Sequence, residues 1–176
     1  MQNTRNKLKD DVYSDNAINL SRLSKDKNTQ VGAVIVASDG TPVSWGYNGT
    51  VSGFPDDIIP HSRDLVKLHY IENINDNISH IEFETNKYPF MAHAESNAIF
   101  FADRQKLVGS TIYVTGFPCV HCALEIARAN ISRVVVKNKE CIDSNSMLNN
   151  QSNEAKMIFA KKGILVTVDG VDILLS

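Results

Sequence analysis

The stretch HAESNAIFF (93–101) places a histidine and a glutamate two residues apart at the start of an otherwise apolar run. Neither residue indicates chemistry alone, because a single histidine in such a run is usually a core residue and a glutamate at a helix start is favoured by the helix dipole. The pattern gains meaning only if further metal ligands lie elsewhere in the chain. His93 and Glu95 are therefore the first candidates for a reactive site.

Two cysteines in FPCVHCALEIARAN, which begins at Phe117, provide such ligands. Cys119 and Cys122 are three positions apart, so at the N-terminal end of a helix their side chains lie on one face and both sulfurs can reach one metal ion. The unpaired N–H groups of a helix N-terminus also stabilise the thiolate that zinc requires. Pro118 suits a helix start, where no backbone N–H is needed.

His93, Cys119 and Cys122 together make three protein ligands, and the sequence offers no obvious fourth. A structural zinc ion normally has four protein ligands, whereas a catalytic zinc ion has three and keeps one position for water. Glu95 is expected to point away from the His93 ligand direction and to accept a proton from that water, whose pKa zinc lowers to about 7. The alternative is a structural zinc module, in which Glu95 would be the closest candidate for a fourth ligand.

The elements that must position these groups follow from the periodicity of apolar residues. An amphipathic helix is expected over 12–23, and a β-hairpin is expected from QVGAVIVA (from Gln30) through the turn 38–40 to PVSWGYN (from Pro42). Further along, helices and strands alternate, which indicates crossover connections and parallel strands behind the hairpin. The expected elements are helices at 94–104, 120–130 and near 152–162, and strands at 110–115, 133–137 and 164–168.

A polar, asparagine-rich stretch separates the hairpin from the reactive region. It runs from Asn48 to Tyr88, with Gly49, Gly53, Pro55 and Pro60 near its start and a short helix expected near 65–74. The segment is too long for an ordinary connection, so we expect a functional loop or an insertion at about 49–90. The chain length otherwise predicts one compact domain over 1–176.

Composition limits the classes of partner. The formal net charge is -2, with 18 Lys+Arg against 20 Asp+Glu, so the chain lacks the basic excess of a nucleic-acid-binding protein. This composition is compatible with a small anionic ligand that is bound by local charges. No run of 18 apolar residues and no signal peptide is found, so we expect no membrane partner and a cytoplasmic protein. Three cysteines in such a chain argue against a disulfide framework.

The pair H-A-E and P-C-V-H-C, on consecutive predicted helices, matches the signature of zinc-dependent nucleobase deaminases. Over about 20–163 the chain resembles the deoxycytidylate deaminase family, although its polar stretch between Arg63 and Tyr88 is longer than we expect there. The resemblance is carried by SKDKNTQVGAVIV (24–36), GYNG (46–49), DD (56–57), KYPF (87–90), HAESNAI (93–99) and YVTGFPCVHCA (113–123). It implies a three-layer α/β/α fold with a mixed sheet of about five strands and conversion of dCMP to dUMP.

The resemblance also implies roles for single residues. Zinc would be held by His93, Cys119 and Cys122, while Glu95 would move protons between the water, N3 of the cytosine ring and the departing ammonia. Substrate contacts would come from the backbone N–H of Ala94 to the cytosine carbonyl, from Asn48 to the sugar, from Phe117 to the base and from Val31. For the 5′-phosphate the matching residues are Ser24 and Lys25, with Lys27 and Arg22 as nearby alternatives.

Regulation is a further implication of the resemblance. Such enzymes are typically activated by dCTP, inhibited by dTTP and assembled as hexamers. The expected regulatory residues are Gly46, Tyr47, Asn48, Gly49 and Arg63, with Mg²⁺ and with Lys67 or Lys87 as further cations for a triphosphate. The alternative is that the long stretch is only a surface loop.

The remaining candidates have simpler explanations. His121 lies between the cysteines and is expected to project off the metal face, and Cys141 has no ligand spacing. A second metal site built from His61, His69, His80 and Asp56 or Asp57 is the less favoured reading, because scattered histidines in a polar stretch are usually solvated. Another deaminase of the same fold, acting on a free base, a riboside or a tRNA adenine, is the alternative function.

Overall fold

The structure is a computed structural model that describes residues 2–26, 28–51, 53, 59–60, 62–74, 76–137 and 148–173. The chain divides into two compact units. One unit is Met1–Gly49 together with His93–Ser176, which we call the catalytic unit, and the other is Thr50–Ala92, which we call the hairpin unit. The hairpin unit falls on the segment that the sequence predicts to be a loop or insertion.

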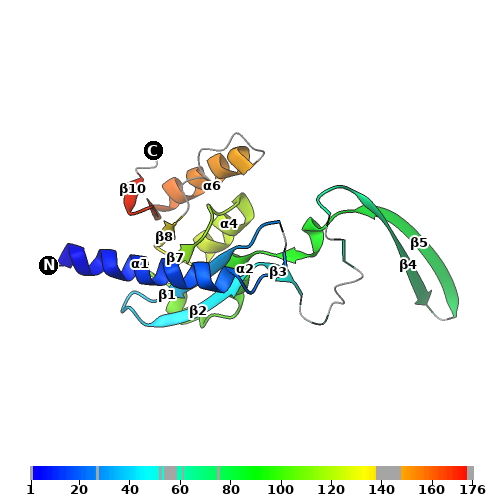
Figure 1. Cartoon of the computed structure of the whole chain (residues 1–176), viewed down its shortest axis with the longest axis horizontal. Helices are drawn as coiled ribbons and strands as arrows, with labels where there is room; N and C mark the ends of the chain where they lie inside the picture. The colour runs from blue at the N-terminus through cyan, green and yellow to red at the C-terminus, as the bar shows by residue number, and fades with distance from the viewer. Residues whose placement is uncertain are drawn as a thin grey trace. The chain divides into compact units, whose positions relative to one another are not determined.

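The catalytic unit is built on a six-stranded mixed sheet in the order β10-β9-β8-β7-β1-β2 (Figure 1). The strands β7, β8 and β9 are parallel, whereas β1 is antiparallel to both β2 and β7. Their bounds are β1 Gly32–Val36, β2 Pro42–Tyr47, β7 Thr111–Val114, β8 Arg133–Val136, β9 Leu165–Val168 and β10 Val171–Ile173. The sixth strand, β10, is missing from the predicted five because it has only three residues. It returns along β9 after a tight turn in which Asp169 and Gly170 have positive φ.

Helices cover both faces of this sheet, which confirms the predicted three-layer α/β/α fold. On one face α1 packs through Ala17 against alternate strand residues, among them Val34 and Val36. The other face carries the larger core, in which Ala33 and Ile35 meet α2, α4 and α6. Successive residues of a strand point to opposite faces of the sheet. Because β1 is buried along its whole length, its side chains contribute to the cores on both faces. The helices are α1 Gln2–Ser21, α2 Ala94–Phe100, α3 Arg104–Leu107, α4 Val120–Arg128 and α6 Leu148–Lys162.

Two predicted helix boundaries were wrong. The helix expected over 12–23 begins ten residues earlier, at Gln2. The helix expected over 94–104 is two helices, because α2 ends at Phe100 and the Asp103 side chain caps α3 by accepting from the Gln105 N–H at 3.0 Å.

The hairpin unit contains β4 (Val66–Ile74) and β5 (Asn77–Thr85), which form an antiparallel hairpin with Tyr70 opposite Ile81. The helix predicted near 65–74 is therefore wrong. Val66, Leu68 and Tyr70 lie on one face at a spacing of two, opposite Thr85, Phe83 and Ile81, and these cross-strand pairs favour a strand over a helix. A 3-10 turn, η1 (Tyr88–Phe90), follows, and β3 (Gly49–Thr50) pairs with β6 (Met91–Ala92).

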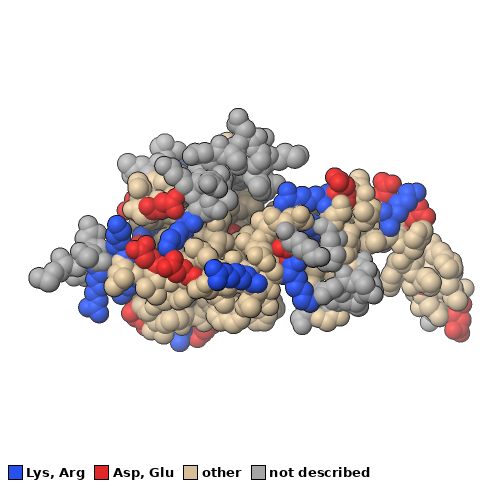
Figure 2. Space-filling model, viewed as in Figure 1, with Lys and Arg blue, Asp and Glu red and all other residues tan. Residues whose placement is uncertain are grey.

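The charges of the two units are mixed in sign. On the face that Figure 2 shows, Lys and Arg side chains lie among Asp and Glu side chains, with no continuous basic band over the described residues. Among these residues no helix has the length and apolar character needed to span a membrane.

Candidate metal centre and active site

His93, Cys119 and Cys122 meet at one point of the catalytic unit, as the sequence predicts. The Nδ1 atom of His93 lies 3.5 Å from the Cys119 Sγ and 3.3 Å from the Cys122 Sγ. In a tetrahedral zinc site with ordinary Zn–N and Zn–S bonds, a nitrogen and a sulfur ligand are about 3.6 Å apart. The three side chains therefore fit zinc in both ligand type and spacing, and they form the one such group found among the described residues.

The local structure explains why these ligands converge. His93 is the residue that precedes α2, and Cys119 is the residue that precedes α4. Both helices pack on the same core through small side chains, of which Ala94, Ala98 and Ala123 are completely buried. Small residues allow the two helices to approach closely, so their N-terminal ends lie side by side.

The three ligand groups shift one another's pKa. The pKa of Cys119 is lowered, chiefly by a hydrogen bond from the Cys122 thiol and also by His93. The same bond raises the pKa of Cys122, and the bond to Cys119 raises the pKa of His93. The cluster thus holds protons that a metal ion would displace, so metal binding is expected to release protons.

Glu95 lies beside this cluster but is not part of it. Its side chain is buried, with 4% of its surface exposed, and it does not belong to the group of convergent ligand atoms. Desolvation raises its pKa, with partial compensation from a backbone hydrogen bond and from His93. Three ligands with a separate buried carboxyl group are the arrangement of a catalytic zinc site, not of a closed structural one.

The predicted sugar and phosphate residues form a connected loop structure. The Asn48 Oδ1 accepts from the Val31 N–H at 2.7 Å, and its Nδ2 donates to the Thr29 carbonyl at 2.8 Å. Ser24 is buried, its hydroxyl accepts from the Asp26 N–H, and its carbonyl accepts from the Gln30 side chain. The structure therefore links the three predicted residues Ser24, Val31 and Asn48. Lys25 is exposed, as is Arg22, and Lys27 lies outside the described residues.

Phe117, predicted to contact the base, is partly buried against the core. Its ring lies edge-on to Phe159, with centroids 6.2 Å apart, and the Lys156 Nζ lies 5.7 Å from its centroid. The sequence does not identify these two α6 residues, because no spacing signal connects them to the cysteine motif. Ala94 is completely buried, and its N–H lies at the start of α2 as predicted.

Residues of the predicted regulatory turn contact α2. A Cβ atom on Gly46 would lie 2.4 Å from the Ala94 carbonyl oxygen, so β2 approaches α2 too closely for any side chain. The Tyr47 carbonyl accepts from the Asn97 side chain at 2.8 Å. Gly49 has open space around it. Arg63 is exposed and belongs to the hairpin unit.

The remaining histidine, lysine and acidic candidates lie outside the metal cluster or outside the described residues. His121 is exposed and outside the ligand group, as predicted. His69 and His80 are exposed hairpin residues, and no second metal cluster occurs in the described parts of the chain. Lys67 pairs with Glu82 at 3.0 Å, and Lys87 is buried with its Nζ 5.8 Å from the Tyr88 ring centroid. The remaining predicted residues, His61, Asp56, Asp57 and Cys141, lie outside the described residues.

Comparison with known proteins agrees with this geometry. Residues 7–138 match the family model described as the cytidine and deoxycytidylate deaminase zinc-binding region. The chain is 36% identical to deoxycytidylate deaminase of Homo sapiens over 141 residues, which cover 80% of this chain and 68% of the relative. It is 34% identical to an uncharacterized deaminase of Aliivibrio fischeri over 151 residues, 86% of each chain.

Solved structures show the same fold. The dCMP deaminase of cyanophage S-TIM5 in its apo form superposes with a TM-score of 0.56 at 24% identity, over 90% of this chain and 95% of that chain. The complex of that phage protein with dCMP and dUMP gives a TM-score of 0.58 at 23% identity, over 90% of this chain and 94% of that one.

Proposed function

We propose that this chain, which belongs to the cytidine and deoxycytidylate deaminase family, catalyses the zinc-dependent hydrolysis of dCMP to dUMP and ammonia. The reaction type is inferred from one observation. The three side chains His93, Cys119 and Cys122 converge as zinc ligands, and the buried carboxyl group of Glu95 lies next to them but is not one of the ligands. The choice of dCMP is supported by the relatives that are named deoxycytidylate deaminases.

The metal would be held by His93, Cys119 and Cys122 and would supply a water molecule of lowered pKa. Glu95 accepts a proton from the attacking water, gives a proton to N3 of the cytosine ring and assists the departure of ammonia. Burial favours its protonated form, so the carboxyl group can hold a proton between these steps. The backbone N–H of Ala94 donates to the cytosine carbonyl.

Substrate positioning is assigned to the loop structure around Asn48. Each polar atom of its amide already makes one hydrogen bond to the 29–31 backbone. One further donor and one further acceptor position remain for a sugar hydroxyl. Ser24 and Lys25 are assigned to the 5′-phosphate, Val31 to the sugar and base, and Phe117 to the base.

A substrate panel tests this function. Ammonia release is followed from zinc-loaded protein with dCMP, deoxycytidine, CMP and dCTP. Two charge-assisted contacts to the phosphate should favour dCMP over deoxycytidine by about a hundredfold or more in kcat/KM. Equal turnover of the nucleoside would show that the substrate is wrong and leave the deaminase reaction. A tRNA substrate added to the panel tests the alternative: ammonia release from its adenine, with none from the four cytosine substrates, would overturn the choice of a cytosine nucleotide and leave only the deaminase reaction.

We also propose regulation by dCTP as activator and dTTP as inhibitor, bound with Mg²⁺, in a homohexamer. The proposal is supported by the turn Gly46–Gly49, which touches two parts of the active site at once. Gly46 packs on the backbone of α2, and Asn48 holds the 29–31 segment. An effector that moves this turn would alter substrate affinity, with a usual coupling of about 1–3 kcal/mol. Hyperbolic dCMP curves that dCTP and dTTP leave unchanged, with no triphosphate binding by calorimetry, would exclude it.

A further inference from the structure

The two helices that carry the metal ligands also carry a matched pair of polar residues. On α2, Ser96 follows His93 by three positions, and on α4, Glu125 follows Cys122 by three positions. Residues three apart lie on the same side of a helix. Ser96 and Glu125 are therefore placed one turn behind the ligands, each on the ligand-bearing side of its helix.

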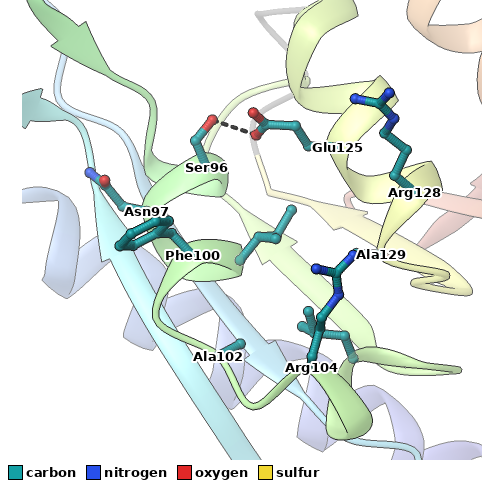
Figure 3. A pocket seen from close by; sticks show the side chains of 10 residues that line it. Ser96, Asn97, Phe100, Ala102, Arg104, Glu125, Arg128 and Ala129 are labelled. Carbon is teal, nitrogen blue, oxygen red and sulfur yellow. Dashed lines mark hydrogen bonds between the residues drawn. The ribbon is translucent and has the colours of Figure 1, made fainter.

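These two side chains reach each other. The Ser96 hydroxyl donates to the Glu125 Oε2 at 2.6 Å, and both side chains are partly buried (Figure 3). A hydrogen bond to a carboxylate at this distance is short and belongs to the stronger class. It is directional, which sets it apart from the contacts of Ala94, Ala98 and Ala123 between the same helices.

An open pocket lies directly beside this bond. A space of about 570 Å³ lies between α2, α3 and α4, and both Ser96 and Glu125 line it. Figure 3 shows the bond bridging α2 and α4 at one end of that space. The small side chains Ala94, Ala98 and Ala123 allow a close approach of α2 and α4, and the bond adds a directional link between the two helices beside this space.

The separation of the helices matters because the ligands are divided between them. His93 immediately precedes α2, Cys119 immediately precedes α4, and Cys122 lies in the first turn of α4. Zinc–ligand distances in protein sites lie within about 0.2 Å of their ordinary values, so a slide of one helix along the other would weaken the His93 bond or the two sulfur bonds.

We propose that Ser96 and Glu125 are positioning residues for the metal centre, and that their hydrogen bond sets the spacing of α2 and α4 at which His93, Cys119 and Cys122 bind zinc. This inference rests on the proposed zinc site and not on the choice of substrate. The positioning role of Ser96 and Glu125 can therefore be disproved while dCMP turnover is confirmed, and it can be confirmed while the choice of dCMP is disproved.

The first measurement is the rate of zinc loss to a chelator from the full-length zinc protein. S96A and E125A should each release zinc roughly tenfold faster, the scale seen when supporting hydrogen bonds of metal ligands are removed. Their double variant should be little worse than either, because both changes delete the same bond. E125Q keeps an oxygen that accepts from Ser96 and should release zinc at a rate close to that of the parent.

The second measurement reads the geometry directly, without turnover. With Co²⁺ in place of zinc, S96A and E125A should shift or broaden the visible absorption bands, and E125Q should restore the parent spectrum. Glu154, an exposed carboxylate on α6, provides the control: E154A should alter neither measurement.

Two results would overturn the proposal. One is zinc release and cobalt spectra in S96A and E125A that match the parent. The other is faster zinc release in E125Q as well, in proportion to a loss of unfolding stability in every variant, since this would reduce the bond to general stabilisation.

Discussion

The catalytic unit and the β4–β5 hairpin both contain strands and ion pairs, but the two regions differ in how far these are buried. In β1 every residue is buried, whereas in β5 every residue except Thr85 is exposed. The ion pair Arg133–Asp10 joins side chains that are 24% and 18% exposed, but Lys67–Glu82 joins side chains that are 64% and 51% exposed. Burial therefore decides whether a similar contact stabilises the fold or merely occurs on its surface.

The reactive groups all lie in the catalytic unit, where Glu95 and Cys122 are buried, Cys119 is partly buried and His93 is exposed. Metal ligands need a fixed separation, and Glu95 needs desolvation for its raised pKa. A two-stranded hairpin provides neither, because such hairpins are at best marginally stable alone. Substitutions of similar chemistry in the two units should therefore have very different effects.

The largest contrast is expected between two glutamates. Glu95→Gln keeps the size of the side chain but cannot carry the proton, so turnover should fall by about a thousandfold, within the usual range for a general acid–base group. Zinc content, measured by atomic absorption, should stay at the parent level. Glu82→Gln in the hairpin should leave both unchanged. Loss of zinc and folding in Glu95→Gln would favour the structural module instead.

The next contrast concerns glycines. In Gly46→Ala the new methyl group would meet the Ala94 oxygen at 2.4 Å and the Ala98 nitrogen at 2.6 Å, both backbone atoms of α2. The free energy of unfolding should fall by about 3 kcal/mol, the upper part of the range for overpacking. Gly53→Ala meets no atom but has φ +90°, so it should cost only about 1 kcal/mol. Urea unfolding followed by circular dichroism measures both, and equal losses would contradict the packing argument.

Ion pairs should give a smaller contrast. Asp10 accepts two bonds from Arg133 and one from the Tyr113 hydroxyl. Asp10→Ala should therefore lower the free energy of unfolding by about 2 kcal/mol, because a partly buried guanidinium loses its partner. Lys67→Met should change it by about 0.5 kcal/mol or less.

An internal control separates burial from location in this comparison. Asp15 pairs with Lys137 in the catalytic unit, but its side chain is 61% exposed. Asp15→Ala should resemble Lys67→Met when thermal unfolding of the variants is compared. A loss as large as that of Asp10→Ala would show that the unit, not burial, sets the value of the pair.

The smallest effect is expected from shortening the hairpin. Residues 72–79 can be replaced by Asn-Gly, which joins the opposed pair Ile71 and His80 through a two-residue turn. Zinc content and turnover of dCMP without effectors should stay within about twofold, because the described residues among those removed (72–74 and 76–79) are exposed or half-exposed surface positions. A large loss of zinc or basal turnover would show that the hairpin supports the catalytic unit.

Much of the molecule follows from short-range sequence patterns. The spacing of Cys119 and Cys122 identifies a ligand pair because three positions are nearly one helical turn, and His93 with Glu95 completes a signature of known chemistry. The alternation of strands and helices after residue 93 predicts the layered fold, since buried strands and amphipathic helices each have a distinct period. These properties depend only on neighbours along the chain.

Other features are decided by contacts between distant residues. The strand at Val66–Ile74 exists because β5 pairs with it, and the sequence of that segment alone was compatible with a helix. The need for glycine at position 46 arises from the approach of α2, about fifty residues later in the chain. The Ser96–Glu125 bond and the buried state of Glu95 arise in the same way. Local propensity carries no information about which surfaces meet, so only the packed tertiary structure could determine these features.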